Sequence, residues 1–177
     1  MLQNYNKYKI LKIFFDNPTD SLRLRELCRL SKISPPSTTN YLKKLQKDNL
    51  IRKYVKRDIP YYQAERDNDD FTFYKKISIQ YELHKSGLIN HIWDAVSPCA
   101  IILYGSASKG EDTEDSDIDI FLTGKIKIPD VKKYEKILKK SIHILSEKLD
   151  EVSEELRSNL INGIVLKGFI DDNKSDT

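Results

Sequence analysis

The spacing of apolar residues in the first fifty positions predicts three short helices. Apolar side chains recur at helical spacing over residues 8–15, and Asn17-Pro18 ends that helix. A second apolar face spans residues 24–31. Ser34-Pro35 combines an N-cap with a first-turn proline and opens a third helix, and Asn49 can adopt the left-handed conformation that ends it.

After Leu50 the pattern changes from helical to extended. Residues 51–55 and 61–64 predict two strands, and the charged turn at residues 56–58 joins them into a hairpin. Three helices followed by a basic hairpin is the element order of a winged helix-turn-helix, which this segment resembles over residues 7–65. The resemblance implies that the third helix reads DNA.

The third helix and the hairpin carry the polar side chains that DNA recognition requires. Short hydrogen-bonding residues come first on the helix and suit base edges, whereas lysines follow and suit phosphates. Basic residues of the hairpin lie where a wing would contact the DNA backbone or minor groove. The predicted DNA-binding residues are Ser37, Thr38, Thr39, Asn40, Lys43, Lys44 and Lys47 on the helix, and Lys53, Lys56 and Arg57 on the hairpin.

Charge divides the chain into two unlike halves. Residues 1–66 hold 15 Lys and Arg against 6 Asp and Glu, a net charge of +9, and the remaining residues hold 15 against 21, a net charge of −6. The basic half favours polyanion binding, and the acidic half is compatible with a cation site. Two other interpretations of the basic half stay open: protein docking through a winged helix, and a helical domain with an ordinary solvated basic face.

Residues 67–87 predict a helical connector. Its expected apolar face comprises Phe71, Tyr74, Ile77 or Ser78, Tyr81 and Leu83. An aromatic helix of this kind can pair two copies into a homodimer, and packing within its own chain is the alternative. His84 and His91 have no acidic or cysteine partner at ligand spacing, so neither predicts a metal site.

The motif that carries chemistry begins after a buried strand. Residues 99–104 form an uninterrupted apolar run, which Gly105-Ser106 ends. After a polar loop, residues 117–122 alternate acidic and apolar positions, so Asp117 and Asp119 point to the same face of a half-buried strand. Two carboxylates on one face can hold Mg²⁺. The glycine lets backbone N–H groups approach phosphate oxygens, the serine adds a hydroxyl donor, and Lys109 can neutralise phosphate charge.

This combination resembles the nucleotidyltransferase superfamily of DNA polymerase beta, whose pattern is a strand, Gly-Ser, a spacer of about ten residues and Asp-x-Asp on the next strand. It is more similar still to the minimal nucleotidyltransferases of archaea and bacteria, which read Gly-Ser-x-Ala/Ser-Arg-Gly before Ser-Asp-x-Asp. The matching segments here are residues 105–110 and 116–119. Lys109 replaces the usual arginine, which keeps the charge but loses the two-pronged grip of a guanidinium.

The resemblance covers roughly residues 88–170 and implies transfer of a nucleoside monophosphate from an NTP to a hydroxyl acceptor. It implies that Asp117 and Asp119 are the catalytic, metal-binding residues, with Mg²⁺, or Mn²⁺ in its place, as cofactor. The residues that it assigns to nucleotide binding are Gly105, Ser106, Lys109 and Ser116. By the same resemblance the acceptor could be a protein side chain, a nucleic-acid end or a small molecule. An acidic turn before a buried strand, with no ligand, is the alternative.

The superfamily pattern breaks at one place. Active members carry a third carboxylate on the third strand, but residues 141–146 contain no acid. His143 is the polar residue nearest that position and could act as a base or have no role, while Glu147 and Asp150 lie just beyond. Enzymatic activity is therefore left open. The alternative function is a DNA-binding transcriptional regulator whose degenerate second domain senses a nucleotide.

The remaining elements complete an α+β architecture with a small mixed sheet. Helices are expected over residues 130–140 and 148–160, and extended segments over 141–145 and 162–166. The expected domains are a winged helix-turn-helix over residues 1–66, the connector over 67–87 and a nucleotidyltransferase-like domain over 88–177.

Three features bear on where the protein works. The sequence has no apolar run long enough to cross a bilayer, and its polar N-terminus lacks a signal-peptide cleavage site. We therefore expect a cytoplasmic protein with no membrane partner. Cys28 and Cys99 fall in different predicted domains within apolar surroundings and are expected to be inert core residues.

Overall fold

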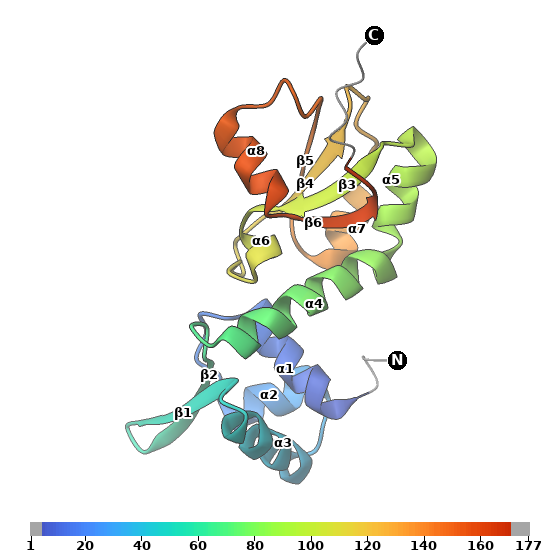
Figure 1. Cartoon of the computed structure of the whole chain (residues 1–177). Helices are drawn as coiled ribbons and strands as arrows, with labels where there is room; N and C mark the ends of the chain where they lie inside the picture. The colour runs from blue at the N-terminus through green and yellow to red at the C-terminus, as the bar shows by residue number, and fades with distance from the viewer. Residues whose placement is uncertain (1–4, 171–177) are drawn as a thin grey trace. The chain divides into compact units, whose positions relative to one another are not determined.

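The computed structural model describes residues 5–170. The chain divides into two compact units, Met1–Lys75 and Lys76–Thr177, and the boundary falls within the long helix α4 (Asp69–Ser86) (Figure 1). The predicted connector of residues 67–87 is thus divided between the two units. None of the helices within residues 5–170 is both long enough and apolar enough to span a bilayer.

The first unit consists of three helices and a two-stranded hairpin. The helices are α1 (Asn6–Asp16), α2 (Leu24–Ser31) and α3 (Pro35–Lys47), and the strands are β1 (Ile51–Lys56) and β2 (Ile59–Ala64). The two strands pair antiparallel, and an isolated bridge joins Leu22 to Tyr62 of β2. This is the element order of a winged helix-turn-helix, as the sequence predicts.

The helices of the first unit share one apolar core. Its completely buried side chains are Ile10 and Phe14 of α1, Leu27 of α2, and Leu42 and Leu45 of α3. Phe71, from the first turn of α4, packs edge-on against Phe15 in the same core. The chain leaves α3 through Asn49, whose φ of 54° is the left-handed conformation that was predicted for it.

The second unit is a four-stranded sheet with helices on both faces. In chain order it contains α5 (Leu88–Val96), β3 (Ala100–Tyr104), α6 (Gly105–Lys109), β4 (Ile118–Thr123), α7 (Lys132–Leu138), β5 (Ile142–Glu147), α8 (Glu154–Ile161) and β6 (Ile164–Gly168). The strand order is β5-β4-β3-β6. β3 pairs antiparallel with β4 and β6, whereas β4 and β5 are parallel. The sheet is mixed, as expected.

Side-chain alternation gives the sheet two apolar faces. Ile101 and Leu103 of β3 face the core that α5 and α7 cover, and Ile102 faces the core that α8 covers (Figure 1). The last turns of α4 join the first of these cores through Leu83.

The helices of the second unit are shorter than the sequence predicts. The helix expected over residues 148–160 begins only at Glu154, because the Ser153 hydroxyl accepts a hydrogen bond from the N–H of Leu156 at 3.3 Å and caps it there. The helix expected over residues 130–140 is confined to Lys132–Leu138. Apolar periodicity alone does not locate such ends.

The expected apolar face of α4 is wrong in part. Phe71 and Leu83 are buried, and so is Ser78, the alternative to Ile77, but Tyr74 is 45 % and Ile77 is 41 % exposed. The physical reason is that α4 contributes Phe71 to one core and Leu83 to another. The residues between them do not need to form one continuous apolar face. Pairing of two copies through α4 stays a prediction.

The expectation of two buried cysteines is also wrong. Cys28 is half-buried, and Cys99 is exposed. β3 begins one residue later, at Ala100, so Cys99 precedes the strand rather than forming part of its buried run.

Candidate functional site

Two carboxylates lie at the beginning of β4. Ile118 and Ile120 are completely buried, and the alternation of the strand directs Asp117 and Asp119 to the opposite face. Burial raises the pKa of Asp119; the neighbouring His143 opposes this shift, and the negative charge of Asp117 adds to it. Asp117 and Asp119 are thus close enough for their charges to interact, as ligands of one cation must be.

The Gly105 turn lies directly against one of these carboxylates. Tyr104, the last residue of β3, is paired with Asp119 across the antiparallel ladder. Gly105, the next residue, therefore lies close to Asp119 at this end of the sheet. Gly105 has a φ of +70°, and a Cβ placed on it would overlap Asp119 Oδ2 and lie 3.3 Å from Asp119 Cγ. Glycine is therefore required twice, by the backbone conformation and by the close approach of the carboxylate.

The turn continues into α6, the short helix that carries the other residues assigned to phosphate binding. Ser106 is half-buried at its start, and Lys109 is exposed at its end. Between them, Ser108 is buried and its hydroxyl donates to the carbonyl of Gly105 at 2.7 Å. The N–H groups of a first helical turn have no acceptor within the helix. The Gly105 turn, which approaches Asp119, thus leads into a short helix that carries a hydroxyl and an exposed lysine.

A buried lysine that sequence reasoning missed fixes the loop between α6 and β4. Lys140 Nζ donates to Asp112 Oδ2 at 3.0 Å, to the carbonyl of Thr113 at 2.5 Å and to the carbonyl of Ser116 at 3.2 Å. The Lys140 and Asp112 side chains are only 12 % and 4 % exposed. Nothing in the sequence distinguishes Lys140 from the other lysines of residues 132–140, so no local signal could have found it.

Ser116 also belongs to this loop. Its hydroxyl accepts a hydrogen bond from the N–H of Thr113 at 2.8 Å and lies 3.1 Å from the Thr113 hydroxyl. The structure therefore gives Ser116 a role in shaping the turn that leads to Asp117. Its predicted contact with a nucleotide stays a prediction.

His143 lies beside Asp119 on the neighbouring strand. The parallel register of β4 and β5 pairs the two residues directly, and His143 Nδ1 is 3.6 Å from Asp119 Oδ1. The acid of β5, Glu147, is paired with Thr123 at the far end of the strand, and Lys125 Nζ lies 3.5 Å from its Oε1. The position nearest to the two aspartates on β5 is therefore occupied by an imidazole and not by a carboxylate.

The donor set suits a hard divalent cation that brings ligands of its own. Within residues 5–170, no group of three His, Cys, Asp or Glu side chains is arranged as a complete metal centre. Asp117 and Asp119 offer carboxylate oxygens, which are the ligands that Mg²⁺ prefers, and Mg²⁺ commonly completes its shell with water and substrate phosphates. The oxygen pair beside the Gly105 turn fits a metal–nucleotide complex better than a free metal ion.

In the first unit, α3 presents most of its predicted DNA-binding residues to solvent. Asn40, Lys43, Lys44 and Lys47 are exposed. Ser37 and Thr39 are half-buried, and their hydroxyls bond to Ser34 Oγ at 3.1 Å and to the Pro35 carbonyl at 2.9 Å. The exposed set forms one polar face with three lysines.

Thr38 is a correction to that set. It is completely buried, and its hydroxyl donates to the carbonyl of Ile33 at 3.3 Å. A side chain held inside the core cannot reach a base edge. Thr38 lies four residues before the buried Leu42 and therefore on the inner face of α3. Because threonine carries a hydroxyl, the sequence pattern assigned it to the polar face.

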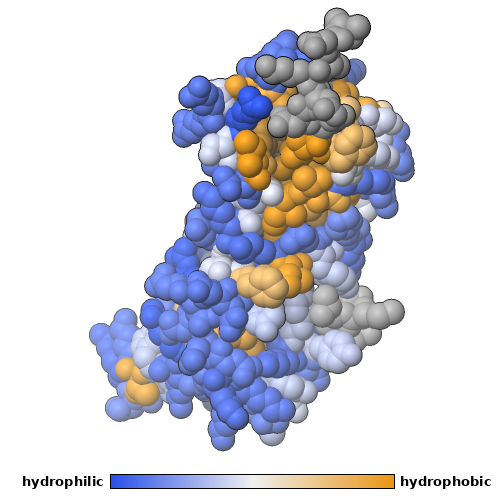
Figure 2. Space-filling view, viewed as in Figure 1, coloured by the Kyte–Doolittle hydropathy of each residue, from blue (hydrophilic) through white to orange (hydrophobic). Residues whose placement is uncertain are grey.

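The hairpin carries exposed basic residues, and aromatic contacts stabilise it. Lys53, Lys56 and Arg57 are all exposed. In the middle of the hairpin, the Tyr54 and Tyr61 rings stack at 5.6 Å, and the Arg23 guanidinium lies 5.1 Å from the Tyr61 ring centroid. Near the tip, Val55 is 64 % and Ile59 is 38 % exposed, which gives the small apolar patch at the end of the hairpin in Figure 2.

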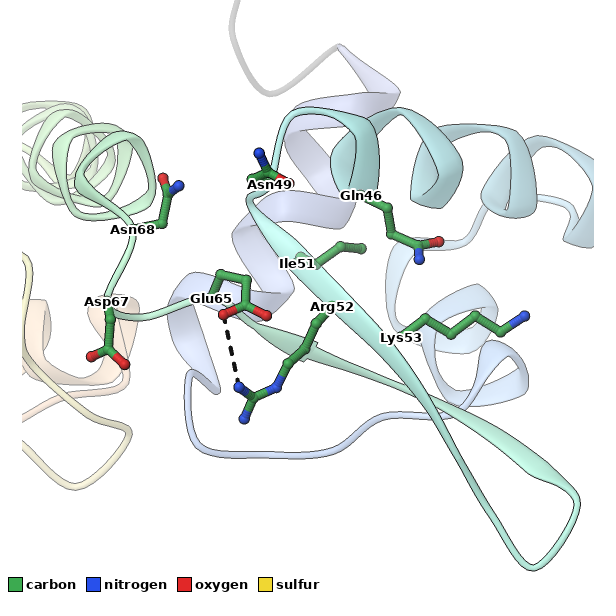
Figure 3. A pocket seen from close by; sticks show the side chains of 8 residues that line it. All are labelled: Gln46, Asn49, Ile51, Arg52, Lys53, Glu65, Asp67 and Asn68. Atoms are coloured by element: carbon green, nitrogen blue, oxygen red, sulfur yellow. Dashed lines mark ion pairs between the residues drawn. The ribbon is translucent and has the colours of Figure 1, made fainter.

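An open pocket of about 590 Å³ lies in the first unit (Figure 3). None of its lining residues belongs to the Gly105 turn. Its lining residues are Gln46, Asn49, Ile51, Arg52, Lys53, Glu65, Asp67 and Asn68. Arg52 Nη1 lies 3.8 Å from Glu65 Oε2, the ion pair drawn in Figure 3. The pocket carries charges of both signs and few apolar groups, so its shape alone does not identify a ligand.

Comparison with known families agrees with this geometry. Residues 88–168 match the family described as polymerase beta, nucleotidyltransferase, a segment that runs from α5 to β6 and includes both the Gly105 turn and the aspartates. Residues 3–52 match winged helix-turn-helix DNA-binding, a segment that includes α1, α2 and α3. No curated protein matches the chain. The chain thus joins an N-terminal domain of the winged helix-turn-helix family to a domain of the polymerase beta nucleotidyltransferase family.

Proposed function

We propose that the second unit is a Mg²⁺-dependent nucleotidyltransferase that moves a nucleoside monophosphate from an NTP to a hydroxyl acceptor. In this reaction the acceptor oxygen forms a bond to the α-phosphorus, the bond from that phosphorus to the bridging oxygen breaks, and pyrophosphate leaves. Bound Mg²⁺, or Mn²⁺ in its place, would neutralise charge on the phosphates. The proton of the acceptor hydroxyl passes to a base or to water.

The observation that carries the proposal is the contact between the Gly105 turn and Asp119. A carboxylate that lies where a Cβ of residue 105 would be supports the proposal, because it brings an acidic oxygen close to the backbone of the turn. Phosphoryl transfer depends on such positioning, because metal ions and fixed donors neutralise charge on the phosphate oxygens. A merely acidic turn before a buried strand would not need the glycine.

Each residue of the site has a distinct role in the proposal. Asp117 and Asp119 would hold the divalent cation, which would supply positive charge to the triphosphate. Gly105 and Ser106 contribute backbone and hydroxyl donors to the triphosphate, and Lys109 neutralises its charge. A lysine acts here as a point charge and lacks the fork of an arginine, so we expect looser phosphate geometry than in members with arginine at this position.

Label transfer tests the activity. The full chain, incubated with α-labelled NTPs, Mg²⁺ and host lysate or an acceptor isolated from it, is expected to label an acceptor. The double variant Asp117→Ala/Asp119→Ala is expected to lose about 100-fold or more of the rate, because no carboxylate holds the cation. The acceptor's class then follows from whether nuclease, protease or filtration removes the label.

The control for label transfer is Asp94→Ala/Asp115→Ala, which removes two exposed carboxylates of the same unit. This variant should transfer label at the wild-type rate. Labelling that survives in Asp117→Ala/Asp119→Ala would show that the chemistry occurs elsewhere and would reject the proposed site.

DNA binding by the first unit is the second part of the proposal. The variant Lys43→Gln/Lys44→Gln/Lys47→Gln is expected to bind duplex DNA about tenfold more weakly at 0.1 M salt. It should also lower the slope of log Kobs against log salt by about 0.9 for each lost phosphate contact. Fluorescence anisotropy of a labelled duplex across a salt series measures both quantities.

The matched control for DNA binding is Lys132→Gln/Lys133→Gln/Lys136→Gln, which removes three exposed lysines of α7 in the other unit. If the two triple variants lose the same affinity and slope, then only net charge matters, and α3 is not the DNA-binding helix.

A second candidate function is a transcriptional regulator whose second unit senses a nucleotide without turning it over. The presence of His143 beside Asp119, and the pairing of Glu147 with Lys125, favour this candidate, because within residues 5–170 no third carboxylate joins the first two as a metal-binding group. Calorimetric titration with NTP, with and without DNA, distinguishes it. The regulator requires different NTP affinities in the two titrations and no label transfer, since coupling between two ligands is reciprocal.

A further inference from the structure

The two carboxylates of the candidate site are held in place in different ways. Asp119 lies within β4, where Tyr104 and His143 pair with it from the two neighbouring strands. Asp117 lies one residue before β4, at the end of the segment of residues 110–117 that joins α6 to the strand without forming a helix or a strand. Strand pairing therefore fixes the backbone of Asp119, whereas the position of Asp117 depends on what holds this segment.

The side chain of Lys140 holds the segment near its end. An ammonium group has three N–H donors, and Lys140 Nζ donates to Asp112 Oδ2 at 3.0 Å, to the Thr113 carbonyl at 2.5 Å and to the Ser116 carbonyl at 3.2 Å. The Ser116 carbonyl belongs to the planar peptide group that leads into Asp117, so its hydrogen bond fixes the orientation of that group. The Lys140 and Asp112 side chains are largely buried, so water competes little for these bonds.

The residues from Thr113 to Ser116 form a turn that is closed by its own hydrogen bonds. The N–H of Ser116 donates to the Thr113 carbonyl at 3.2 Å, and the N–H of Thr113 donates to the Ser116 hydroxyl at 2.8 Å. Lys140 thus binds a closed turn and not an open stretch of chain. The position of its ammonium group therefore determines where the next residue, Asp117, begins.

We infer that Lys140 is a positioning residue of the candidate site, which holds Asp117 where this carboxylate binds the cation of a metal–nucleotide complex together with Asp119. This inference rests on the proposed nucleotidyltransferase function. The ammonium group of Lys140 donates to the protein and not to the nucleotide, so Lys140 acts through Asp117. Its loss should therefore weaken the contribution of the cation to binding, while the Gly105 turn and Lys109 still bind the triphosphate.

Three variants of the full chain separate positioning from stability. Lys140→Met keeps a side chain of similar length but removes its donors. Asp112→Asn breaks the same ion pair, yet Lys140 can still donate to both carbonyls. Asp112→Leu/Lys140→Met removes both charges of the pair, so neither is left buried without the other. The matched control is Lys125→Met, which removes an exposed lysine that pairs with Glu151 of the same unit.

Calorimetric titration with a non-hydrolysable ATP analogue, in Mg²⁺ and in EDTA, measures the effect. The factor by which Mg²⁺ strengthens binding is expected to fall about tenfold or more in Lys140→Met and in the double variant, because both lose the hydrogen bond to the Ser116 carbonyl. It should stay near the wild-type value in Asp112→Asn and Lys125→Met. Affinity in EDTA should be unchanged in all four. Urea unfolding should show that Lys140→Met and Asp112→Asn lose stability, whereas the double variant loses less.

The comparison of variants decides between positioning and a purely structural role. An equal fall of the Mg²⁺ factor in Asp112→Asn and Lys140→Met would show that the ion pair acts only through stability. An unchanged factor in the double variant, which tests the inference even if Lys140→Met does not fold, would show that Asp117 needs no support from Lys140. Either result overturns the inference and leaves the proposed function intact. If the wild type binds the analogue no better with Mg²⁺ than without it, the proposed function is rejected together with the inference.

Discussion

Replacing Asp119 by asparagine is expected to abolish cation-dependent nucleotide binding and, at the same time, to stabilise the fold. The Kd of the metal–NTP complex should rise at least about 100-fold, equivalent to about 2.7 kcal/mol, because the amide removes the charge that holds the cation. Titration calorimetry with and without Mg²⁺ measures this loss.

The gain in stability follows from the pKa of Asp119, which burial raises above its ordinary value of 3.8. A raised carboxyl pKa means that the protonated form favours folding. That contribution is complete below the unfolded-state pKa and is lost as the pH rises through the higher folded-state pKa. At pH 7 the ionised carboxylate therefore costs stability, and Asp119→Asn should raise Tm in the absence of a cation.

The control for Asp119→Asn is Asp115→Asn, which makes the same chemical change at an exposed position of the loop that precedes β4. It should leave nucleotide affinity and Tm unchanged. A drop in the Tm of Asp119→Asn would mean that the carboxylate supports the fold, and retained Mg²⁺-dependent binding would mean that it does not hold the cation.

Gly105→Ala is expected to lose both stability and nucleotide binding. An alanine at a φ of +70° is strained, and its Cβ would overlap Asp119 Oδ2. Together the strain and the overlap should cost about 2–4 kcal/mol in the free energy of unfolding. Displacement of the Asp119 carboxylate should in addition weaken nucleotide binding about 100-fold or more. Urea unfolding and calorimetry measure the two losses separately.

The chain provides a matched control for this glycine. Gly87 has a φ of +84°, but a Cβ on it would meet no atom within 4 Å. Gly87→Ala should therefore show the conformational cost alone, about 1 kcal/mol, with normal nucleotide binding. If Gly105→Ala behaves like Gly87→Ala in both measurements, the approach of the turn to Asp119 has no functional importance.

Local sequence patterns were sufficient to predict the central part of the candidate site. Gly105 ends one strand and Asp119 lies on the next, so antiparallel pairing of neighbouring strands is enough to bring them together. The winged helix-turn-helix elements were predictable for the same reason, because each depends on short-range spacing, caps and turn residues. The exposed lysines of α3 followed from the buried positions of Leu42 and Leu45.

The features that the sequence did not reveal depend on contacts between distant segments. The pairing of His143 with Asp119 requires the parallel register of β4 and β5, which residues within either strand do not specify. The ion pair of Lys140 joins positions 28 residues apart. Thr38 is polar but buried, because its hydroxyl finds an acceptor in the preceding turn, which apolar periodicity does not register.

The hydrogen bonds of Lys140 connect the segment between α7 and β5 to the loop that leads to Asp117 and Asp119. The lysine side chain holds the carbonyls of Thr113 and Ser116, and the next residue, Ser141, accepts the backbone N–H of Ile118 at 2.9 Å. We therefore expect the segment between α7 and β5 to move together with the end of β4 that carries Asp119. A macromolecule that binds this segment would displace Asp117 and Asp119 without contacting the Gly105 turn.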